Sequence, residues 1–233
     1  MESIYGYNQP KPQLLNTKYL SAGIVLSVIT AILYVLQLIL YFLGIEMGYN
    51  HTILFTGFNV LINIFWIALL AVSIPYLSNF NMQSSKALTY ALIGVYLLSI
   101  VINIAFSVAN TYMMETDNVE ISTWINISNV AFMIFNLLLW AVCIGLAVTM
   151  ISNKSDFVGG IRYIGIAYLV MVIGSVLIYF FEKVIFPNFY GIDGFIEIGI
   201  VIISVAHMIL SLLILAGYAY VFMKARQYKM INN

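Results

Sequence analysis

The chain has 233 residues, of which 63% are hydrophobic and 8% carry a charge. Soluble domains are typically about 25% charged, so this composition excludes a water-soluble globular protein. Nine basic and nine acidic side chains give a formal net charge of zero, so we expect no nucleic-acid partner. The composition predicts that the principal environment of the chain is a lipid bilayer.

The first apolar segment follows two lysines, Lys11 and Lys18, as the apolar core of a secretory signal does. However, it extends over residues 19–45, whereas the apolar core of a signal peptide has about 7–15 residues. We therefore expect this segment to be retained as the first membrane span.

A membrane-spanning helix needs about 20 mostly apolar residues. Taken in chain order, the segments that meet this requirement are 20–43, 53–78, 87–112, 121–151, 163–181 and 198–223. The chain then divides into an N-terminal tail (1–19), a transmembrane domain (20–223) and a basic C-terminal tail (224–233). The sequence predicts an all-α, multi-pass membrane protein with six transmembrane helices.

Lysine and arginine gather on one side of this topology. With six spans, that side carries Lys11, Lys18, Lys86, Lys154, Arg162, Lys224, Arg226 and Lys229. The other side carries Lys183 alone. Basic residues close to span ends mark the cytoplasmic side. We therefore expect both termini in the cytoplasm and the protein in the cell membrane.

The even-numbered spans resemble one another. The second and fourth agree without a gap at an offset of 70 residues, and the fourth and sixth at an offset of 75. In the odd-numbered spans, a glycine followed by a β-branched residue recurs every 71 residues, at Gly23, Gly94 and Gly165. We interpret these matches as three parallel helical hairpins, which predicts a pseudo-three-fold bundle about an axis along the membrane normal.

Polar side chains recur on one face of each even-numbered span, at spacings of three, four and seven residues. The alignment predicts one tier of Asn59, Asn129 and Ser204, and a second, deeper tier of Trp66, Asn136 and Ser211. In contrast, Gly23, Ser27 and Ala31 repeat every four residues on the first span, a spacing typical of closely packed helices.

The candidate polar interior consists of Asn59, Asn63, Asn103, Asn129, Asn136, Ser204, His207 and Ser211. Two interpretations stay open. These side chains either form hydrogen bonds between helices or line a water-filled vestibule that opens to the outside. His207 is the main functional candidate, because it is the only ionisable side chain well inside a predicted span. A neutral imidazole can also serve as a packed hydrogen-bonding group.

Metal binding and catalysis are not expected. A metal site needs several ligands at suitable spacing, and the sequence places no such set around His207. The chain has one cysteine, Cys143, which we interpret as a packing residue. We find no nucleophile with a base, no paired carboxylates within a span and no glycine-rich phosphate loop. The sequence therefore predicts no catalytic residue, metal or cofactor.

Three classes of function remain. The preferred interpretation is a non-enzymatic scaffold or accessory subunit that binds other membrane components, such as another membrane protein or a second copy of the chain. The alternative is a channel or transporter for a small neutral solute, since no mid-span carboxylate is present for ion coupling. A membrane-embedded enzyme is the third class.

Overall fold

Long apolar segments cross a bilayer as helices, because a helix pairs its backbone N–H and C=O groups internally. The computed structural model contains α1 (Thr17–Gly44), α2 (Tyr49–Asn79), α3 (Gln83–Thr116), α4 (Ile121–Ile151), α5 (Ile161–Phe180) and α6 (Phe195–Ile231). A π-helical segment, η2 (Phe181–Ile185), continues α5. Six of the described helices are long and apolar enough to span a membrane, which confirms the predicted multi-pass, all-helical fold class.

The structure describes residues 17–44, 49–80, 82–116, 121–153, 160–185 and 195–231. Within these ranges it describes only the backbone at residues 43–44, 49–53, 110–116, 121–126, 128–129, 185, 195–198, 200 and 228–231. The described residues include no strand.

The helices extend beyond the apolar limits that the sequence suggests. α1 begins at Thr17, inside the expected N-terminal tail, and α6 continues to Ile231 through most of the expected C-terminal tail. Polar residues outside the hydrocarbon continue the i to i−4 hydrogen-bond pattern, so a helix need not end where its apolar sequence ends.

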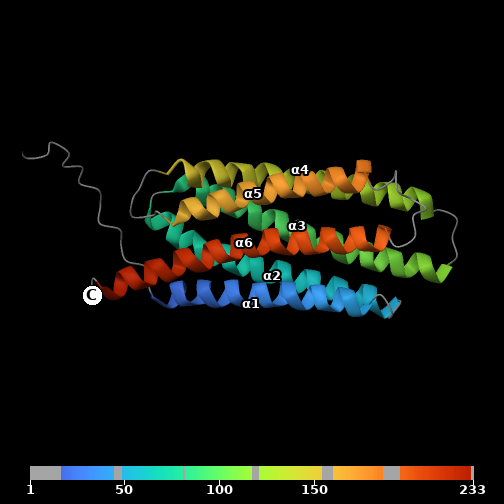
Figure 1. Cartoon of the computed structure of the whole chain (residues 1–233), viewed down its shortest axis with the longest axis horizontal. Coiled ribbons are helices and arrows are strands. Elements are labelled where there is room, and N and C mark those ends of the chain that lie inside the picture. Colours follow the sequence, from blue (N-terminus) through green and yellow to red (C-terminus); the bar gives the residue numbers. More distant parts are fainter. Residues whose placement is uncertain are drawn as a thin grey trace, which may run out of the picture.

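The helices run up and down and pack in chain order. Each contacts the next, and α6 packs on α1, so that these contacts form a closed ring. Figure 1 shows the bundle from the side. α1 begins and α6 ends on the left of Figure 1, so both ends of the helical chain lie at the same end of the bundle.

The recurring glycines differ in their surroundings. A Cβ atom on Gly23 would lie 2.5 Å from the Phe222 ring, and one on Gly165 would lie 3.0 Å from Cβ of Met150. Gly94 has no such neighbour within 4 Å. The ring order suits three hairpins, but these glycines are not in equivalent environments. The internal repeat and the pseudo-three-fold arrangement therefore stay predictions.

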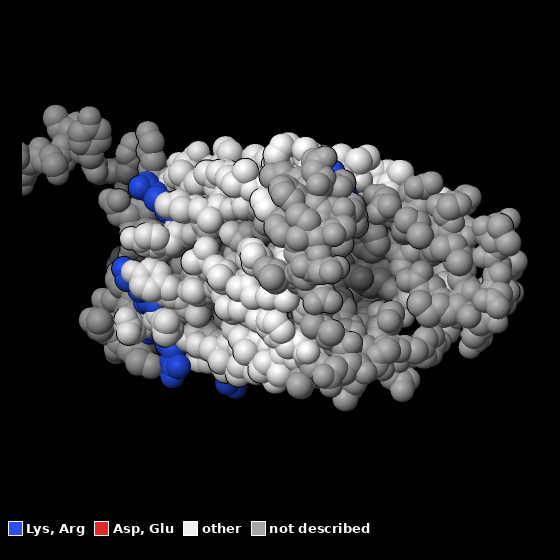
Figure 2. Space-filling view, turned by 45° about the vertical axis from the view of Figure 1, so that its right-hand side comes forward, with Lys and Arg blue, Asp and Glu red and all other residues white. Residues whose placement is uncertain are grey.

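One end of the bundle collects basic side chains, and we call it the basic end. It carries Lys18, Lys86, Arg162, Lys224 and Arg226, at the starts of α1, α3 and α5 and near the end of α6. Figure 2 shows most of the described Lys and Arg side chains on that face gathered at its left end. At the opposite end, Lys183 Nζ lies 3.5 Å from Glu182 Oε1.

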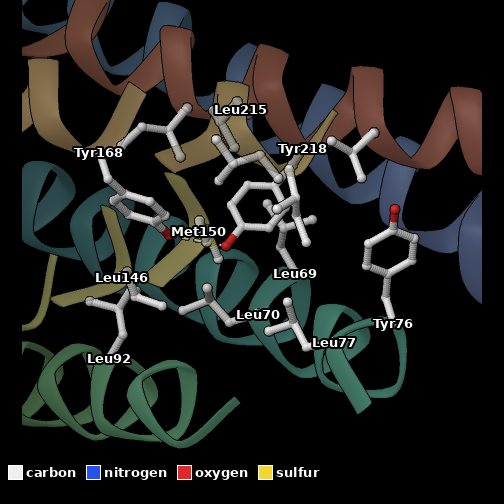
Figure 3. Packing of buried hydrophobic residues seen from close by; sticks show 14 of the residues in the cluster. Leu69, Leu70, Tyr76, Leu77, Leu92, Leu146, Met150, Tyr168, Leu215 and Tyr218 are labelled. Carbon is white, nitrogen blue, oxygen red and sulfur yellow. Dashed lines mark hydrogen bonds between the residues drawn. The ribbon is translucent and has the colours of Figure 1, made fainter. Parts of the chain in front are cut away.

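The buried core lies mainly in the half of the bundle that is nearer the basic end. Leucines of α2, α3 and α4 surround two tyrosines, Tyr168 of α5 and Tyr218 of α6 (Figure 3). Most buried serine and threonine hydroxyls in this half bond to their own helices, whereas Ser85 Oγ of α3 donates to Thr149 Oγ1 of α4 at 3.0 Å. Ser27 donates to the Gly23 carbonyl oxygen at 2.9 Å, for example. Such back-bonding satisfies the hydroxyl without a partner helix, so we assign these groups to packing.

Candidate functional site: a polar chamber above an aromatic layer

Five aromatic side chains and one thiol, one from each helix, gather in the middle of the bundle, and we call them the aromatic layer. They are Tyr34, Trp66, Tyr96, Cys143, Tyr168 and Tyr218. Trp66 stacks on Tyr96 with ring centroids 5.7 Å apart, and it meets the edge of Tyr218 at 6.5 Å. Trp66 and Tyr168 are each 1% exposed, and Tyr218 is 2% exposed. Cys143 is also 1% exposed, whereas Tyr34 and Tyr96 are partly buried, so the layer is most closely packed at its other four members.

The polar atoms of the layer bond to one another. Trp66 Nε1 donates to Tyr34 Oη at 3.0 Å, and the Tyr168 and Tyr218 hydroxyls lie 3.1 Å apart. Tyr34 also forms a hydrogen bond with Ser211. Buried indole and phenol groups usually find such partners, because an unpaired polar group is costly away from water.

Tyr34 thus joins Trp66 and Ser211, two members of the predicted second tier. The third member, Asn136, is partly buried on α4, and no contact brings it to this pair among the described residues.

A chamber of about 180 Å³ lies on the side of the aromatic layer that faces away from the basic end. α1, α2 and α6 line it with Tyr34, Gln37, Leu38, Tyr41, Phe55, Ile203, Ser204, His207 and Met208. Tyr34 belongs both to the chamber wall and to the aromatic layer, so the chamber reaches the layer at this residue.

Neutral polar groups line this chamber from α1 and α6, and one of them bonds to an amide of α2. Gln37 Nε2 donates to Asn59 Oδ1 at 2.6 Å, which ties α1 to α2. Ser204 and His207 are one helical turn apart on α6, and the His207 side chain is exposed. Glu182, in η2, interacts electrostatically with His207.

Asn63 and Asn103 belong to a different cluster, which joins α2 to α3. Asn63 Nδ2 donates to Ser99 Oγ at 3.2 Å. Asn103 Nδ2 donates to the Ser99 carbonyl oxygen at 2.9 Å and to its Oγ at 3.2 Å. This cluster forms an interhelical hydrogen-bond network, and its amides lie outside the set of residues that line the chamber.

The predicted candidates thus divide between several places. Ser204 and His207 line the chamber, Asn59 bonds to the lining residue Gln37, Ser211 bonds to Tyr34, and the side chain of Asn129 lies outside the described residues. The candidate set omits Tyr34, Gln37 and Tyr41 of α1. Their spacing of three and four residues places them on one helix face, and this stripe could have revealed them.

The chamber can exchange hydrogen bonds with a neutral polar group, because an amide, a hydroxyl and a neutral imidazole each both donate and accept. No set of three His, Cys, Asp or Glu side chains within the described ranges is placed to hold a metal ion. Comparison with protein-family models, curated proteins and solved structures finds no match to this chain. The function is therefore inferred from the residues of this chain alone.

Proposed function

We propose that this multi-pass membrane protein is a non-enzymatic scaffold or accessory subunit that binds another component of the membrane. The aromatic layer is the observation that carries this proposal. Side chains from all six helices meet there, and Trp66 and Tyr168 are each 1% exposed. A route for a solute needs a wetted or polar wall through the whole depth of the bilayer. Close packing at the layer therefore supports binding over passage.

The outward face of α3 is the proposed site for the partner. In the most apolar stretch of α3, 6% of the residues are buried, compared with 39% in α2. This face exposes the small residues Ala87, Ala91 and Gly94 and the larger apolar residue Val101. Small residues allow the backbone of a second transmembrane helix to approach closely.

A photo-crosslinking experiment tests this face with a matched control. Val101 on α3 and Leu177 on α5 are each 63% exposed, so a photoreactive amino acid at either position should meet its surroundings equally well. In native membranes we expect a discrete protein adduct from position 101 and only lipid adducts from position 177. Equal lipid labelling at both positions would contradict a partner on α3.

Passage of a small neutral solute is the second candidate, and the polar chamber favours it. In that case, the aromatic layer would act as a gate that has to open. We expect proteoliposomes to take up glycerol and urea no faster than protein-free vesicles. Faster uptake that the His207→Ala variant abolishes would overturn the scaffold proposal in favour of transport.

We also infer that the basic end faces the cytoplasm, which the positive-inside rule supports. Ser84, near the start of α3, is exposed at the basic end, and Glu182 is exposed at the opposite end. The native thiol of Cys143 is 1% exposed, so it should contribute little background. In intact cells, an impermeant maleimide should label Glu182→Cys but should label Ser84→Cys only after permeabilisation. The reverse pattern would invert the orientation, and external labelling of both would contradict six spans.

A further inference from the structure

A second cavity lies between α5 and α6 near the basic end, and nothing in the proposed function uses it. It has a volume of about 400 Å³ and is lined by Tyr163, Ile166, Ala167, Val170, Leu213, Ala216, Gly217 and Tyr220. We call it the α5–α6 groove. Its depth comes from small residues, because Ala167, Ala216 and Gly217 leave space between larger neighbours.

The polarity of the groove changes along its length. Its far part, at Val170 and Leu213, is purely apolar. Tyr163 and Tyr220 stand at its end nearer the basic end, with ring centroids 5.6 Å apart and planes at 87°. Lys224 lies beyond them, with its Nζ 5.1 Å from the centre of the Tyr220 ring. Along the groove toward the basic end, an apolar wall is followed by two phenol groups and then by an ammonium group. This order matches the acyl chain, ester region and phosphate of a phospholipid.

The basic surroundings favour an anionic phospholipid over a zwitterionic one. Arg162 precedes Tyr163, and its Nε donates to the Asn153 carbonyl oxygen at 2.8 Å, which holds the guanidinium at this end. Arg226, two residues after Lys224 on α6, is also exposed. Every charged side chain described at this end is a cation. Basic pockets between transmembrane helices commonly hold anionic lipid headgroups.

The dimensions of the groove favour an acyl chain over a partner helix. Residues 163–170 of α5 span about 10 Å along the helix axis, which is less than the roughly 15 Å depth of one leaflet. A helix with its side chains is about 10–12 Å wide. Tyr163 and Tyr220 flank one end of the groove, and among the described residues this is the end that bears a cation. A single hydrocarbon chain can lie on Ala216 and Gly217 between these walls.

We propose that the α5–α6 groove binds one acyl chain of an anionic phospholipid, whose phosphate is held by Lys224. Tyr163 and Tyr220 lie at the level of the ester groups, where aromatic side chains are favoured at a membrane interface. This proposal does not depend on the scaffold function, because the groove is on a different face from the outward side of α3.

Native mass spectrometry of the intact chain, titrated with phosphatidylglycerol or with phosphatidylcholine of the same acyl chains, tests the proposal. We expect the wild-type protein to retain phosphatidylglycerol preferentially. One basic residue near an anionic lipid contributes about fivefold in affinity, so Lys224→Gln should weaken phosphatidylglycerol binding by about that factor. Lys86→Gln removes a cation from α3 at the same end, away from the groove, and should leave the affinity unchanged.

A second variant tests the groove itself. Ala216 is exposed, so Ala216→Phe should fold while filling the space for the acyl chain; it should abolish the preference for phosphatidylglycerol while keeping Lys224. Equal retention of both lipids by the wild-type protein, or an unchanged preference in both groove variants, would overturn the proposal. Co-purification of a second polypeptide that Ala216→Phe alone disrupts would show instead that the groove receives a helix. If soluble glycerol phosphate displaced phosphatidylglycerol as effectively as added phosphatidylglycerol does, the site would bind only the phosphate and not the acyl chain.

Discussion

Replacing Trp66 by alanine is expected to destabilise the protein by roughly 3–5 kcal/mol, the range for removing a buried large aromatic side chain. Trp66 is 1% exposed, stacks on Tyr96 at 5.7 Å and donates a hydrogen bond to Tyr34 at 3.0 Å. Lipid gives no hydrophobic driving force between helices, so the loss comes from packing contacts and the cavity left behind. Reversible unfolding in mixed micelles measures the change.

Two control variants separate packing from hydrogen bonding. Trp66→Phe keeps a ring against Tyr96 but removes the donor to Tyr34, so it should cost about 1 kcal/mol, near the range measured for hydrogen bonds within membranes. Trp140 is only partly buried and meets Tyr179 edge-on at 5.9 Å. Trp140→Ala should therefore destabilise the protein clearly less than Trp66→Ala. Equal losses for the two alanine variants would mean that the aromatic layer has no special role in stability.

The number of the helices could be predicted because backbone pairing leaves a bilayer-spanning segment little choice, whereas their ends could not, because helices such as α6 continue into polar sequence. The inward faces could not be predicted in the same way. Ile62 is 3% exposed, whereas Ile64 is 49% exposed, although both are isoleucines of α2. In a soluble protein, apolar residues would mark the inside. In lipid, both sides of a helix are apolar, so composition does not separate the core from the surface.

The polar residues indicated which face of each helix turns inward, but they did not indicate which faces meet. The sequence places Asn59 on an inward stripe of its span, and the structure pairs it with Gln37, 22 residues earlier in the chain. Which stripe meets which depends on the rotation of each helix about its axis, which no local pattern specifies. For this reason the chamber wall contributed by α1 was missed. The repeat alignment has the same weakness, because it compares helices one at a time and does not place them around an axis.

The close packing at Gly23 was predictable from the four-residue spacing of Gly23, Ser27 and Ala31, and it leads to the second large effect. A Cβ atom there would lie 2.5 Å from both Cδ2 and Cε2 of Phe222, closer than real Cβ contacts. The Phe222 ring has little freedom to move, because it is 1% exposed and packs against Tyr218 at 6.2 Å and Tyr76 at 6.0 Å. α1 and α6 would therefore have to separate, at the contact that closes the ring of helices.

Gly23→Leu is accordingly expected to destabilise the protein by about 3 kcal/mol, at the upper end of the usual cost of overpacking. Gly94→Leu is the matched control on α3, where an added Cβ meets nothing within 4 Å; it should not lower the free energy of unfolding and should raise it by up to about 1 kcal/mol, because leucine is the better helix former. Adding Phe222→Ala to Gly23→Leu should restore part of the loss, since a double-mutant cycle reports coupling between residues in contact. Additive losses in that cycle, or equal losses from the two leucine variants, would show that α1 and α6 do not meet through this pair.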